Sequence, residues 1–328
     1  MTKKLIITTD FTSKLSLFKL DRKILNNLKK RHKNIIIKKI DPKKVKQDKK
    51  SSIYWGTRIN DRIIDLLPNL KWVHFGSIGA DKLSYKKVKE KKIIVTNSKL
   101  INTESVFNLI ILYLLDTTRK LLINKKKYKN RNEYEKTFLN TKDFTKQKIL
   151  VLGYGNVAKK IHRFSNFNKL NTNFFSRRKN IIKKNKKIFV SSKKIKNLVK
   201  NYDTIINLLP NNEINKEFLG KKMISKFKKN VSLILVGRQE SIDLKYLKKF
   251  LAKNKKSSCY FDAIQKSDNK RIFGQISNLK NTFISPHIGG YSHGYWPKQF
   301  DLFNNNLKLF KRKKKLINVV KISKHNFS

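Results

Sequence analysis

The stretch KILVLGYGNVAKKIHRFSNFNKLNTNFFSRR, Lys148–Arg178, decides the fold of this 328-residue chain. It opens with the apolar run Ile149-Leu150-Val151-Leu152, passes through the glycine turn GYGNVA and continues into a segment with helical spacing. A short apolar strand, a glycine turn and a helix in this order are typical of a dinucleotide-binding βα unit. The stretch therefore predicts a doubly wound α/β sheet at the centre of the chain.

Each small residue of the turn has a physical task in such a unit. Gly153 makes the tight turn, Gly155 lets the backbone approach a pyrophosphate, and Ala158 is small enough for close packing of the helix. At the start of the helix, unpaired N–H groups are available to phosphate oxygens. The glycine turn is therefore predicted to hold the phosphates of a dinucleotide.

Length and composition indicate a globular protein of two domains. A chain of 328 residues can bury two cores, hydrophobic residues make up 39%, and glycine and proline are scarce. The apolar stretches, such as Leu109–Leu115, are too short to span a bilayer, and the N-terminal residues lack the apolar core of a signal peptide. Cys259 is the only cysteine, so no intramolecular disulfide can form. We expect a cytoplasmic protein that does not enter membranes.

The formal net charge of +58 permits two interpretations. A basic protein can bind nucleic acid or an anionic membrane surface. Lysines are spread over the whole chain, however, together with abundant Asn, Ile and Phe, whose codons are also rich in A and T. No RNP, zinc or helix-turn-helix signature accompanies the charge. Codon drift is the favoured interpretation, and nucleic acid is expected to bind only non-specifically, at low salt.

The N-terminal third alternates between strand and helix patterns. Short apolar runs predict strands at 5–7, 35–37, 70–75 and 93–95, and helical spacing predicts helices at 20–30 and 61–67. A long helix follows from Thr103, and its apolar residues at Val106–Leu115 cover more than one face. A helix that is apolar almost all round is buried on several sides. This helix is expected to form an interdomain spine or a subunit interface.

The end of the second strand of the nucleotide unit indicates which cofactor binds. An acidic residue about 20 positions beyond the glycines binds the adenosine ribose in NAD enzymes. This chain has Ser176, Arg177 and Arg178 there, after the strand at 173–175. Two guanidiniums and a hydroxyl suit a 2′-phosphate. Drift could also have placed basic residues here, but A/T-rich codons favour lysine over arginine. NADP is therefore favoured over NAD.

Four more strands are predicted, at 204–209, 233–236, 259–262 and 283–285. Ligands bind outside the carboxyl ends of the strands in a doubly wound sheet. The residues at these ends are therefore candidate cofactor contacts: Leu209, Pro210, Gly237 and Asp262.

Two further strand-end residues have side chains suited to chemistry on a 2-oxo acid. The planar fork of Arg238 can bind a carboxylate with two hydrogen bonds. His287 lies between Pro286 and a glycine pair, and an imidazole can donate a proton near neutral pH as a carbonyl becomes an alcohol. The alternatives are an ordinary surface arginine in a basic protein and a structural histidine.

The motifs VLGYGNVA, INLLP, VGRQESID, YFDAIQ and SPHIGGYS, in this order and spacing, resemble those of the D-isomer-specific 2-hydroxyacid dehydrogenases, in particular the glyoxylate/hydroxypyruvate reductases. KWVHFGSIGADKL, VTNSKLINTESV, GYWPKQFDLFNNNLKLF and LINVV extend the resemblance over nearly the whole chain. It implies an α/β protein of two Rossmann-like domains with doubly wound parallel sheets. The nucleotide domain, 99–290, would be inserted into a discontinuous, flavodoxin-like substrate domain, 1–98 plus 291–328. The resemblance also implies a homodimer joined through the nucleotide domains.

The resemblance assigns roles residue by residue. Arg238 would bind the substrate's carboxylate and carbonyl oxygen, His287 would protonate that oxygen as hydride arrives, and Asp262 would hold the nicotinamide carboxamide. Asn156 and Val157 would present the pyrophosphate turn. Backbone N–H groups around Ser77, Ile78 and Gly79 would bind the substrate carboxylate. It implies no metal.

Two departures from the family pattern bear on catalysis. The family's third catalytic residue is a glutamate that hydrogen-bonds the histidine. Counting forward from YFDAIQ places Ser267 at that position, and counting back from SPHIGG places Asp268 there. Asp268 is the candidate catalytic carboxylate, because a shorter carboxylate can still stabilise imidazolium. Gln239 stands where the family usually has glycine.

The sequence as a whole predicts an NADPH-dependent reductase of small 2-oxo acids, with glyoxylate or hydroxypyruvate favoured. The alternative is a nucleotide-sensing binding protein that has lost turnover, similar to the family's corepressors. The missing glutamate and the basic surface point to that alternative.

Overall fold

The computed structural model describes most of the chain, namely residues 4–11, 20, 22–41, 43–44, 46–77, 83, 85–124, 131–132, 135, 141–178, 189–190, 194–262, 270–320, 322–323 and 326–327. The chain divides into two compact units, each with its own sheet. Unit 1 comprises 1–102 and 292–328, and unit 2 comprises 103–291. Sequence motifs placed the corresponding boundaries after residues 98 and 290.

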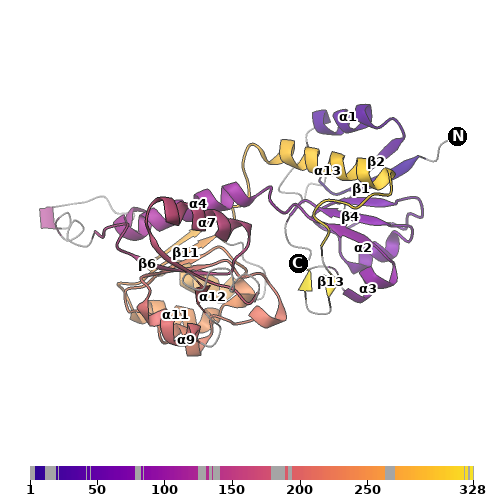
Figure 1. Ribbon diagram of the computed structural model, residues 1–328. Helices are drawn as coiled ribbons and strands as arrows, with labels where there is room; N and C mark the ends of the chain where they lie inside the picture. The colour runs from indigo at the N-terminus through magenta and orange to yellow at the C-terminus, as the bar shows by residue number, and fades with distance from the viewer. Residues whose placement is uncertain are drawn as a thin grey trace. The chain divides into compact units, whose positions relative to one another are not determined.

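Unit 1 contains a five-stranded parallel sheet in the order β2-β1-β3-β4-β5 (Figure 1). The strands are β1 (Leu5–Thr9), β2 (Ile35–Lys39), β3 (Ile53–Gly56), β4 (Trp72–Phe75) and β5 (Ile94–Thr96). This order is that of flavodoxin-like sheets, as the family resemblance implied. A separate two-stranded pair, β13 (Ile322–Ser323) and β14 (Asn326–Phe327), lies near the C-terminus.

Helices cover both faces of this sheet. On one face lie α1 (Arg22–Arg31) and α13 (Tyr295–Lys311), and on the other lie α2 (Asp61–Leu66) and α3 (Tyr85–Glu90) (Figure 1). Phe303 of α13 stacks on Trp55 and Trp72, with ring centroids 4.0 and 5.1 Å apart. Since these rings are fully buried, the C-terminal helix completes the core that the N-terminal strands begin.

Unit 2 contains a seven-stranded sheet in the order β12-β11-β10-β9-β6-β7-β8, with every neighbouring pair parallel. The strands are β6 (Lys148–Leu152), β7 (Asn171–Phe175), β8 (Phe189–Val190), β9 (Thr204–Asn207), β10 (Ser232–Leu235), β11 (Ser258–Asp262) and β12 (Thr282–Ser285). The direction of strand progression reverses between β6 and β9. At such a switch point the loops leave a crevice at the carboxyl ends of the strands.

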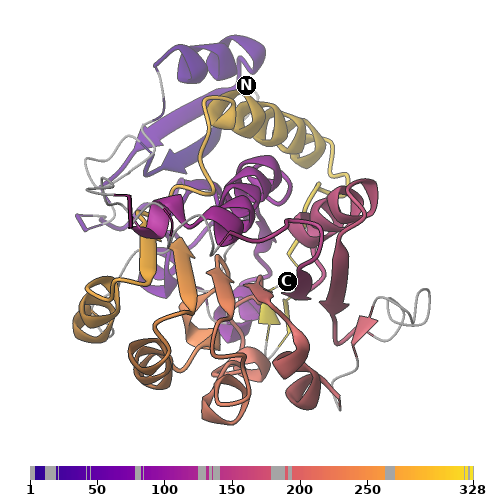
Figure 2. The same cartoon turned by 90° about the vertical axis from the view of Figure 1, so that its left-hand side faces the viewer.

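Strand β6 is an unbroken apolar run after Lys148 because both faces of the sheet are buried there. Ile149 and Val151 of β6 face α4 (Thr103–Arg119) and α7 (Asn156–Phe167). Leu150 and Leu152 face the opposite helices (Figure 2). Those helices are α9 (Ile195–Leu198), α10 (Lys221–Ile224), α11 (Leu244–Lys253) and α12 (Lys270–Ser277). The remaining short elements are α5 (Leu121–Asn124), η1 (Val199–Asn201), η2 (Glu213–Asn215) and η3 (Gln239–Ser241).

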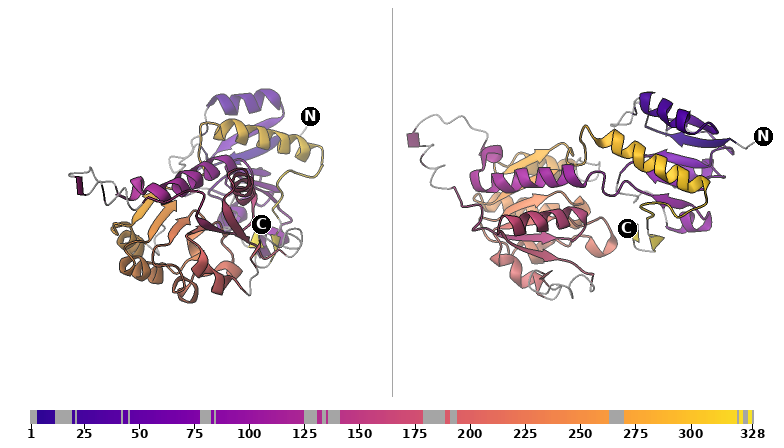
Figure 3. Two further views of the ribbon diagram at one scale, coloured as in Figure 1. Left: turned by 60° about the vertical axis from the view of Figure 1, so that its left-hand side comes forward. Right: turned by 45° about the horizontal axis from the view of Figure 1, so that its top comes forward.

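The predicted α/β class with two parallel sheets is confirmed, but the central strand β3 and the two-residue strands β8, β13 and β14 were not predicted. β3 follows the lysine-rich segment that was interpreted as a connection, and it lies at the middle of the unit 1 sheet. Helix α4 runs beside α7 (Figure 3) and buries one side, but Leu112 and Leu115 are 50% and 46% exposed. No helix in the described part of the chain is long and apolar enough to cross a membrane.

Candidate active site

The predicted site residues of unit 2 follow neighbouring strands and share one edge of the sheet. In order across the sheet, they are His287 after β12, Asp262 at the end of β11, Gly237 and Arg238 after β10, Leu209 and Pro210 after β9, Gly153–Val157 after β6, and Ser176–Arg178 after β7. Neighbouring strands lie about 4.8 Å apart. Arg238 and His287 therefore start from strands separated by roughly 10 Å, with Asp262 between them.

The glycine turn after β6 has the geometry that a dinucleotide needs. Gly153 has φ +101°, and a Cβ there would lie 3.2 Å from the Leu208 carbonyl oxygen, so a side chain would be both strained and crowded. Around Gly155 no atom lies within 4 Å of a Cβ position. No side chain caps the N-terminus of α7. Backbone N–H groups at Asn156 and Val157 are thus placed to bind an anion, and these residues fit a pyrophosphate.

The two arginines after β7 point to different neighbours. Arg178 donates from its guanidinium to the carbonyl oxygen of Tyr154, inside the glycine turn, and its N–H bonds Ser176 Oγ at 3.2 Å. Arg177 donates to Asn215 Oδ1 and lies 5.0 Å from the ring centre of Phe218. Both arginines are exposed, whereas Ser176 is buried. The edge next to the glycine turn is therefore cationic where an NAD enzyme would have a carboxylate.

The backbone of Arg238 is fixed from both sides. Its N–H donates to the Leu209 carbonyl oxygen (3.1 Å), and its carbonyl oxygen accepts from Ser241 Oγ (2.6 Å). Gly237 permits this approach, since a Cβ would lie 2.9 Å from the same Leu209 oxygen. Among the described residues, none pairs with the guanidinium of Arg238, which is half-buried. A guanidinium held in place and left unpaired suits a carboxylate ligand.

Gln239, the departure noted in the sequence, lies beside this arginine at the start of η3. Its Nε2 is buried and has no hydrogen-bond acceptor among the described residues. A buried amide without a partner is destabilising. The glutamine therefore has no packing advantage visible in this loop.

His287 is exposed at the tip of the turn after β12, and its backbone is in the left-handed region at φ +55°. Left-handed conformations of non-glycine residues cluster at functional sites and cost about 1 kcal/mol or more. The carboxylate of Asp262 accepts from the N–H groups of Ile288 and Gly289, at 2.9 Å each, and from Ser285 Oγ. A carboxylate has about four acceptor positions, and the contacts of Asp262 within the described part of the chain use three of them, which suits it to accept a carboxamide N–H as well.

Four residues of the predicted site lie outside the described residues: Ile78, Gly79, Ser267 and Asp268. Ser77 is described, in unit 1, and its carbonyl oxygen accepts from the N–H of Ser98 at 3.1 Å. Whether Ser267 or Asp268 replaces the family glutamate stays a prediction. In the part of the chain with described coordinates, no group of three or more His, Cys, Asp or Glu side chains could hold a metal ion.

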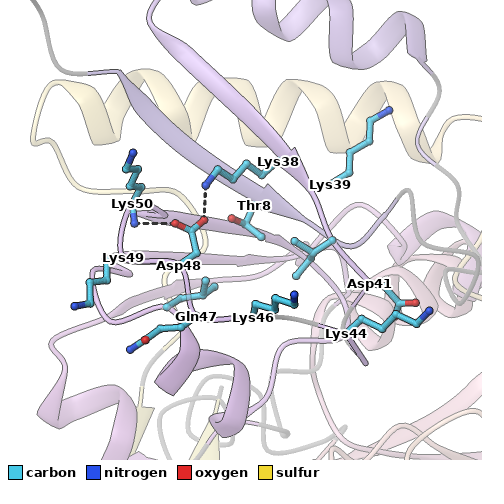
Figure 4. A pocket seen from close by; sticks show the side chains of 12 residues that line it. Thr8, Lys38, Lys39, Asp41, Lys44, Lys46, Gln47, Asp48, Lys49 and Lys50 are labelled. Carbon is cyan, nitrogen blue, oxygen red and sulfur yellow. Dashed lines mark hydrogen bonds and ion pairs between the residues drawn. The ribbon is translucent and has the colours of Figure 1, made fainter.

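One hollow of about 620 Å³ in unit 1 is lined by several lysines (Figure 4). Six lysines and two aspartates contribute to its lining. Lys38 pairs with Asp48 at 2.7 Å. Partial burial raises the pKa of Asp48, but hydrogen bonds from Lys38, Lys50 and Ser51 lower it to about 2. The lining of this hollow carries more positive than negative side chains, but it contains no histidine and no glycine turn. It is therefore not a candidate site for hydride transfer.

A family comparison agrees with this geometry. The model of the D-isomer specific 2-hydroxyacid dehydrogenase, NAD binding domain, matches residues 111–289. The chain belongs to the D-isomer-specific 2-hydroxyacid dehydrogenases. The resemblance seen in the sequence is thereby confirmed, and the protein is an NAD(P)-dependent oxidoreductase of the class that interconverts 2-oxo and 2-hydroxy acids.

Relatives of this dehydrogenase are distant but extensive. Glyoxylate/hydroxypyruvate reductase A of Arabidopsis thaliana is 25% identical over 70% of this chain and 71% of its own. Glyoxylate reductase of Pyrococcus horikoshii is 24% identical over 87% and 88%. The NADPH-dependent glyoxylate/hydroxypyruvate reductase of Sinorhizobium meliloti, solved with NADP and malonate, has a TM-score of 0.75 at 18% identity, covering 97% of both chains. This last likeness shows the shared fold.

Proposed function

We propose that this dehydrogenase reduces small 2-oxo acids of the glyoxylate and hydroxypyruvate class and that it favours NADPH. One observation carries the proposal. An unpaired guanidinium, Arg238, and an exposed imidazole, His287, follow strands two places apart. Both lie at the edge that also presents the uncapped N-terminus of α7. A carboxylate anchor, a proton donor and a dinucleotide site are thus collected at one edge of one rigid sheet.

The residues of the chain divide the reaction between them. Arg238 binds the substrate carboxylate with its two parallel N–H groups and polarises the carbonyl oxygen. Asp262 orients the cofactor's carboxamide with its remaining acceptor position. The reduced nicotinamide, when bound, supplies the hydride that adds to the carbonyl carbon. His287 gives its proton to the carbonyl oxygen, which leaves a 2-hydroxy acid and a neutral imidazole.

The preference for NADPH is supported by Arg177 and Arg178. A 2′-phosphate carries charge and three acceptor oxygens, and guanidiniums bind such groups with charge-assisted hydrogen bonds. Arg178 already reaches the glycine turn, beside which the adenosine ribose binds in this fold. The glyoxylate and hydroxypyruvate class is supported by the names of the relatives in Arabidopsis and Pyrococcus.

A homodimer and a cytoplasmic location belong to the same proposal. The exposed Leu112 and Leu115 are one helical turn apart on α4, and Leu121 follows with 63% exposure. Three such leucines on one segment suit a second subunit. The cytoplasmic location rests only on the single cysteine, Cys259, which is buried and reduced.

A substrate panel tests the proposal directly. The purified protein is mixed with NADPH or NADH and with glyoxylate, hydroxypyruvate, pyruvate and a bulky aromatic 2-oxo acid. We expect steady loss of the 340 nm absorbance, about tenfold faster with NADPH than with NADH. The loss should be fastest with glyoxylate and hydroxypyruvate. Cofactor binding without oxidation by any acid would instead support the nucleotide-sensing alternative.

A further inference from the structure

The backbone N–H groups of the strained turn at His287 donate to groups at the ends of β11 and β12. The His287 N–H donates to the Ser285 carbonyl oxygen at 2.9 Å, and the next two N–H groups, of Ile288 and Gly289, both donate to Asp262. Since the left-handed conformation of His287 is unfavourable by itself, these contacts determine whether it persists. Asp262 therefore restrains the backbone that carries the imidazole.

Gly289 shows how closely the carboxylate approaches this turn. A Cβ at this position would lie 2.6 Å from Asp262 Oδ2 and 2.9 Å from a methyl carbon of Leu109 on α4. Both distances are shorter than side chains permit. The turn is thus enclosed between the carboxylate and helix α4, and a small rotation of Asp262 would change its backbone.

Ser285 fixes Asp262 with its single hydroxyl proton. Ser285 Oγ lies 2.5 Å from Asp262 Oδ1 and 3.3 Å from the Phe261 carbonyl oxygen. One proton serves one strong bond, and the shorter bond to the charged carboxylate is favoured. A donor that occupies the lone pair of Ser285 Oγ also strengthens the outgoing bond, because linked hydrogen bonds polarise one another.

That donor is Tyr113, on α4. Its hydroxyl donates to Ser285 Oγ at 2.7 Å, and its side chain is fully buried. Burial and the charge of Asp262 raise the pKa of Tyr113 to about 12, although its hydrogen bond to Ser285 acts in the opposite direction. The phenol is therefore protonated at every pH at which the enzyme would work.

A second buried tyrosine provides a natural control. Tyr260 stacks on Tyr113 with ring centroids 5.3 Å apart and is equally buried, but its hydroxyl donates to Asp116 at 2.8 Å. Asp116, on α4, also accepts from the N–H of Leu122 on α5. The hydrogen bond of Tyr260 therefore connects β11 to α4 and α5, and not to the turn at His287. The two tyrosine hydroxyls are both buried and differ in their hydrogen-bond acceptor, which is Ser285 Oγ for Tyr113 and the Asp116 carboxylate for Tyr260.

We propose that Tyr113 is a positioning residue for His287, which acts through Ser285 and Asp262. The chain of hydrogen bonds runs from Tyr113 to Ser285, from Ser285 to Asp262, and from the Ile288 and Gly289 amides back to Asp262. The claim that Tyr113 holds the turn at His287 does not depend on the proposed function, whereas the predicted effect of Tyr113 on turnover rests on it. Helix α4 thereby helps to set the orientation of the proton donor.

Amide hydrogen exchange tests the structural part without any substrate. In Tyr113→Phe, the Ile288 and Gly289 amides are expected to exchange about fivefold faster than in the native protein, the effect of losing one buried hydrogen bond. In Tyr260→Phe, their exchange should change less than twofold, even if this variant unfolds at a lower temperature. Equal exchange at these two amides in native protein and Tyr113→Phe, or the same acceleration in both variants, would overturn the proposal.

A double-variant comparison tests whether Ser285 carries the effect. Ser285→Ala should accelerate exchange at the same amides, and adding Tyr113→Phe to it should accelerate exchange no further, since the link is already cut. Additive effects would show that Tyr113 acts by another route and would refute the proposed chain.

Turnover of glyoxylate with NADPH supplies the functional readout. Tyr113→Phe should lower kcat about threefold to tenfold with less than a twofold change in the KM for glyoxylate, while Tyr260→Phe retains native kcat. A native kcat in Tyr113→Phe would contradict the positioning role. If the native protein oxidises NADPH with none of the acids, the proposed function fails, and the exchange experiment still decides whether Tyr113 holds the turn.

Discussion

Both units have a parallel sheet whose strands end in polar residues, but the two edges differ in how these residues are hydrogen-bonded and exposed. In unit 1, Asp10 follows β1 and is buried, but its carboxylate accepts from Tyr54 Oη (2.8 Å) and from the N–H groups of Thr57 and Arg58 (3.1 and 2.6 Å). In unit 2, the corresponding edge has an exposed His287, and among the residues that the structure describes no side chain caps α7 or pairs with the guanidinium of Arg238. Each sheet is parallel and flanked by helices on both faces.

The difference shows that the architecture does not decide whether a sheet edge binds a ligand. In unit 1 the Asp10 carboxylate is bonded within the chain, and Gln299 Nε2 likewise donates to Gly76 O and Ser98 Oγ at 2.8 and 2.6 Å. In unit 2 the side chain of His287 is exposed and that of Arg238 is half-buried at this edge. Substitutions at the first edge should therefore change stability, and substitutions at the second should change binding and turnover.

The largest expected effect is on turnover, at His287. In His287→Gln, kcat should fall about 10²–10⁴-fold because the proton donor is lost, while the melting temperature stays within about 2 °C of the native value. His293→Gln, an exposed histidine six residues later, is the matched control and should retain native turnover. A large loss of stability in His287→Gln, or native turnover, would break the contrast between the units.

Cofactor affinity should depend on Gly155. The open space around it accepts a Cβ without a clash, so Gly155→Ala should fold normally, yet its methyl group would occupy the approach to the pyrophosphate. We expect the Kd for NADPH, measured by fluorescence titration, to rise about tenfold or more. Gly274→Ala, in α12 and equally free of neighbours, should leave the Kd unchanged and slightly stabilise its helix.

Acid stability should depend on a histidine of unit 1. Burial lowers the pKa of His74 to about 3, below the ordinary value of about 6.5 in the unfolded chain. Below pH 6.5 the unfolded state takes up a proton that the folded state excludes. The free energy of unfolding should therefore fall by about 1.4 kcal/mol per pH unit from this group, down to about pH 3.

Urea unfolding at pH 7.5 and 5.5 measures this loss. The native protein should lose more stability between the two pH values than His74→Gln, by about 1 kcal/mol. Identical pH dependence in the two proteins would mean that His74 is protonated in the folded state, and that unit 1 is less closed at this position than the structure indicates.

The smallest of these effects should be on cofactor preference. In Arg178→Ala, the ratio of kcat/KM for NADPH to that for NADH should fall about fivefold, through loss of one charged hydrogen-bond donor near the 2′-phosphate. Arg163→Ala, which removes an exposed arginine from α7, should not change the ratio. An unchanged ratio in Arg178→Ala would favour codon drift as the origin of the arginine pair.

Local patterns predicted the fold and most of the candidate site. The strands of unit 2 contain short apolar runs that end in glycine, proline or charged residues, so both the strands and their ligand-facing ends can be found from sequence spacing. Strand β3 was missed because it spans only Ile53–Gly56 and directly follows a lysine-rich segment. A run this short gives little periodicity to detect.

The hydrogen bonds of Tyr113 and Tyr260 could not be predicted in the same way. Their partners Ser285 and Asp116 are 172 and 144 residues away along the chain. In the sequence, Tyr113 lies within the apolar run of a long helix. The sequence near it shows only that a hydroxyl group will be buried. A buried tyrosine hydroxyl needs a partner, but only the folded topology identifies which one.

The left-handed backbone at His287 limits which residues could ever replace it. Asparagine tolerates this conformation better than almost any other non-glycine residue, and its codons differ from those of histidine by a single nucleotide. We expect an Asn in this place to be compatible with the fold and with dinucleotide binding, and to lack the proton that we propose His287 delivers. Because of this backbone conformation, a single-nucleotide change could convert the enzyme into a protein that binds the dinucleotide without turnover.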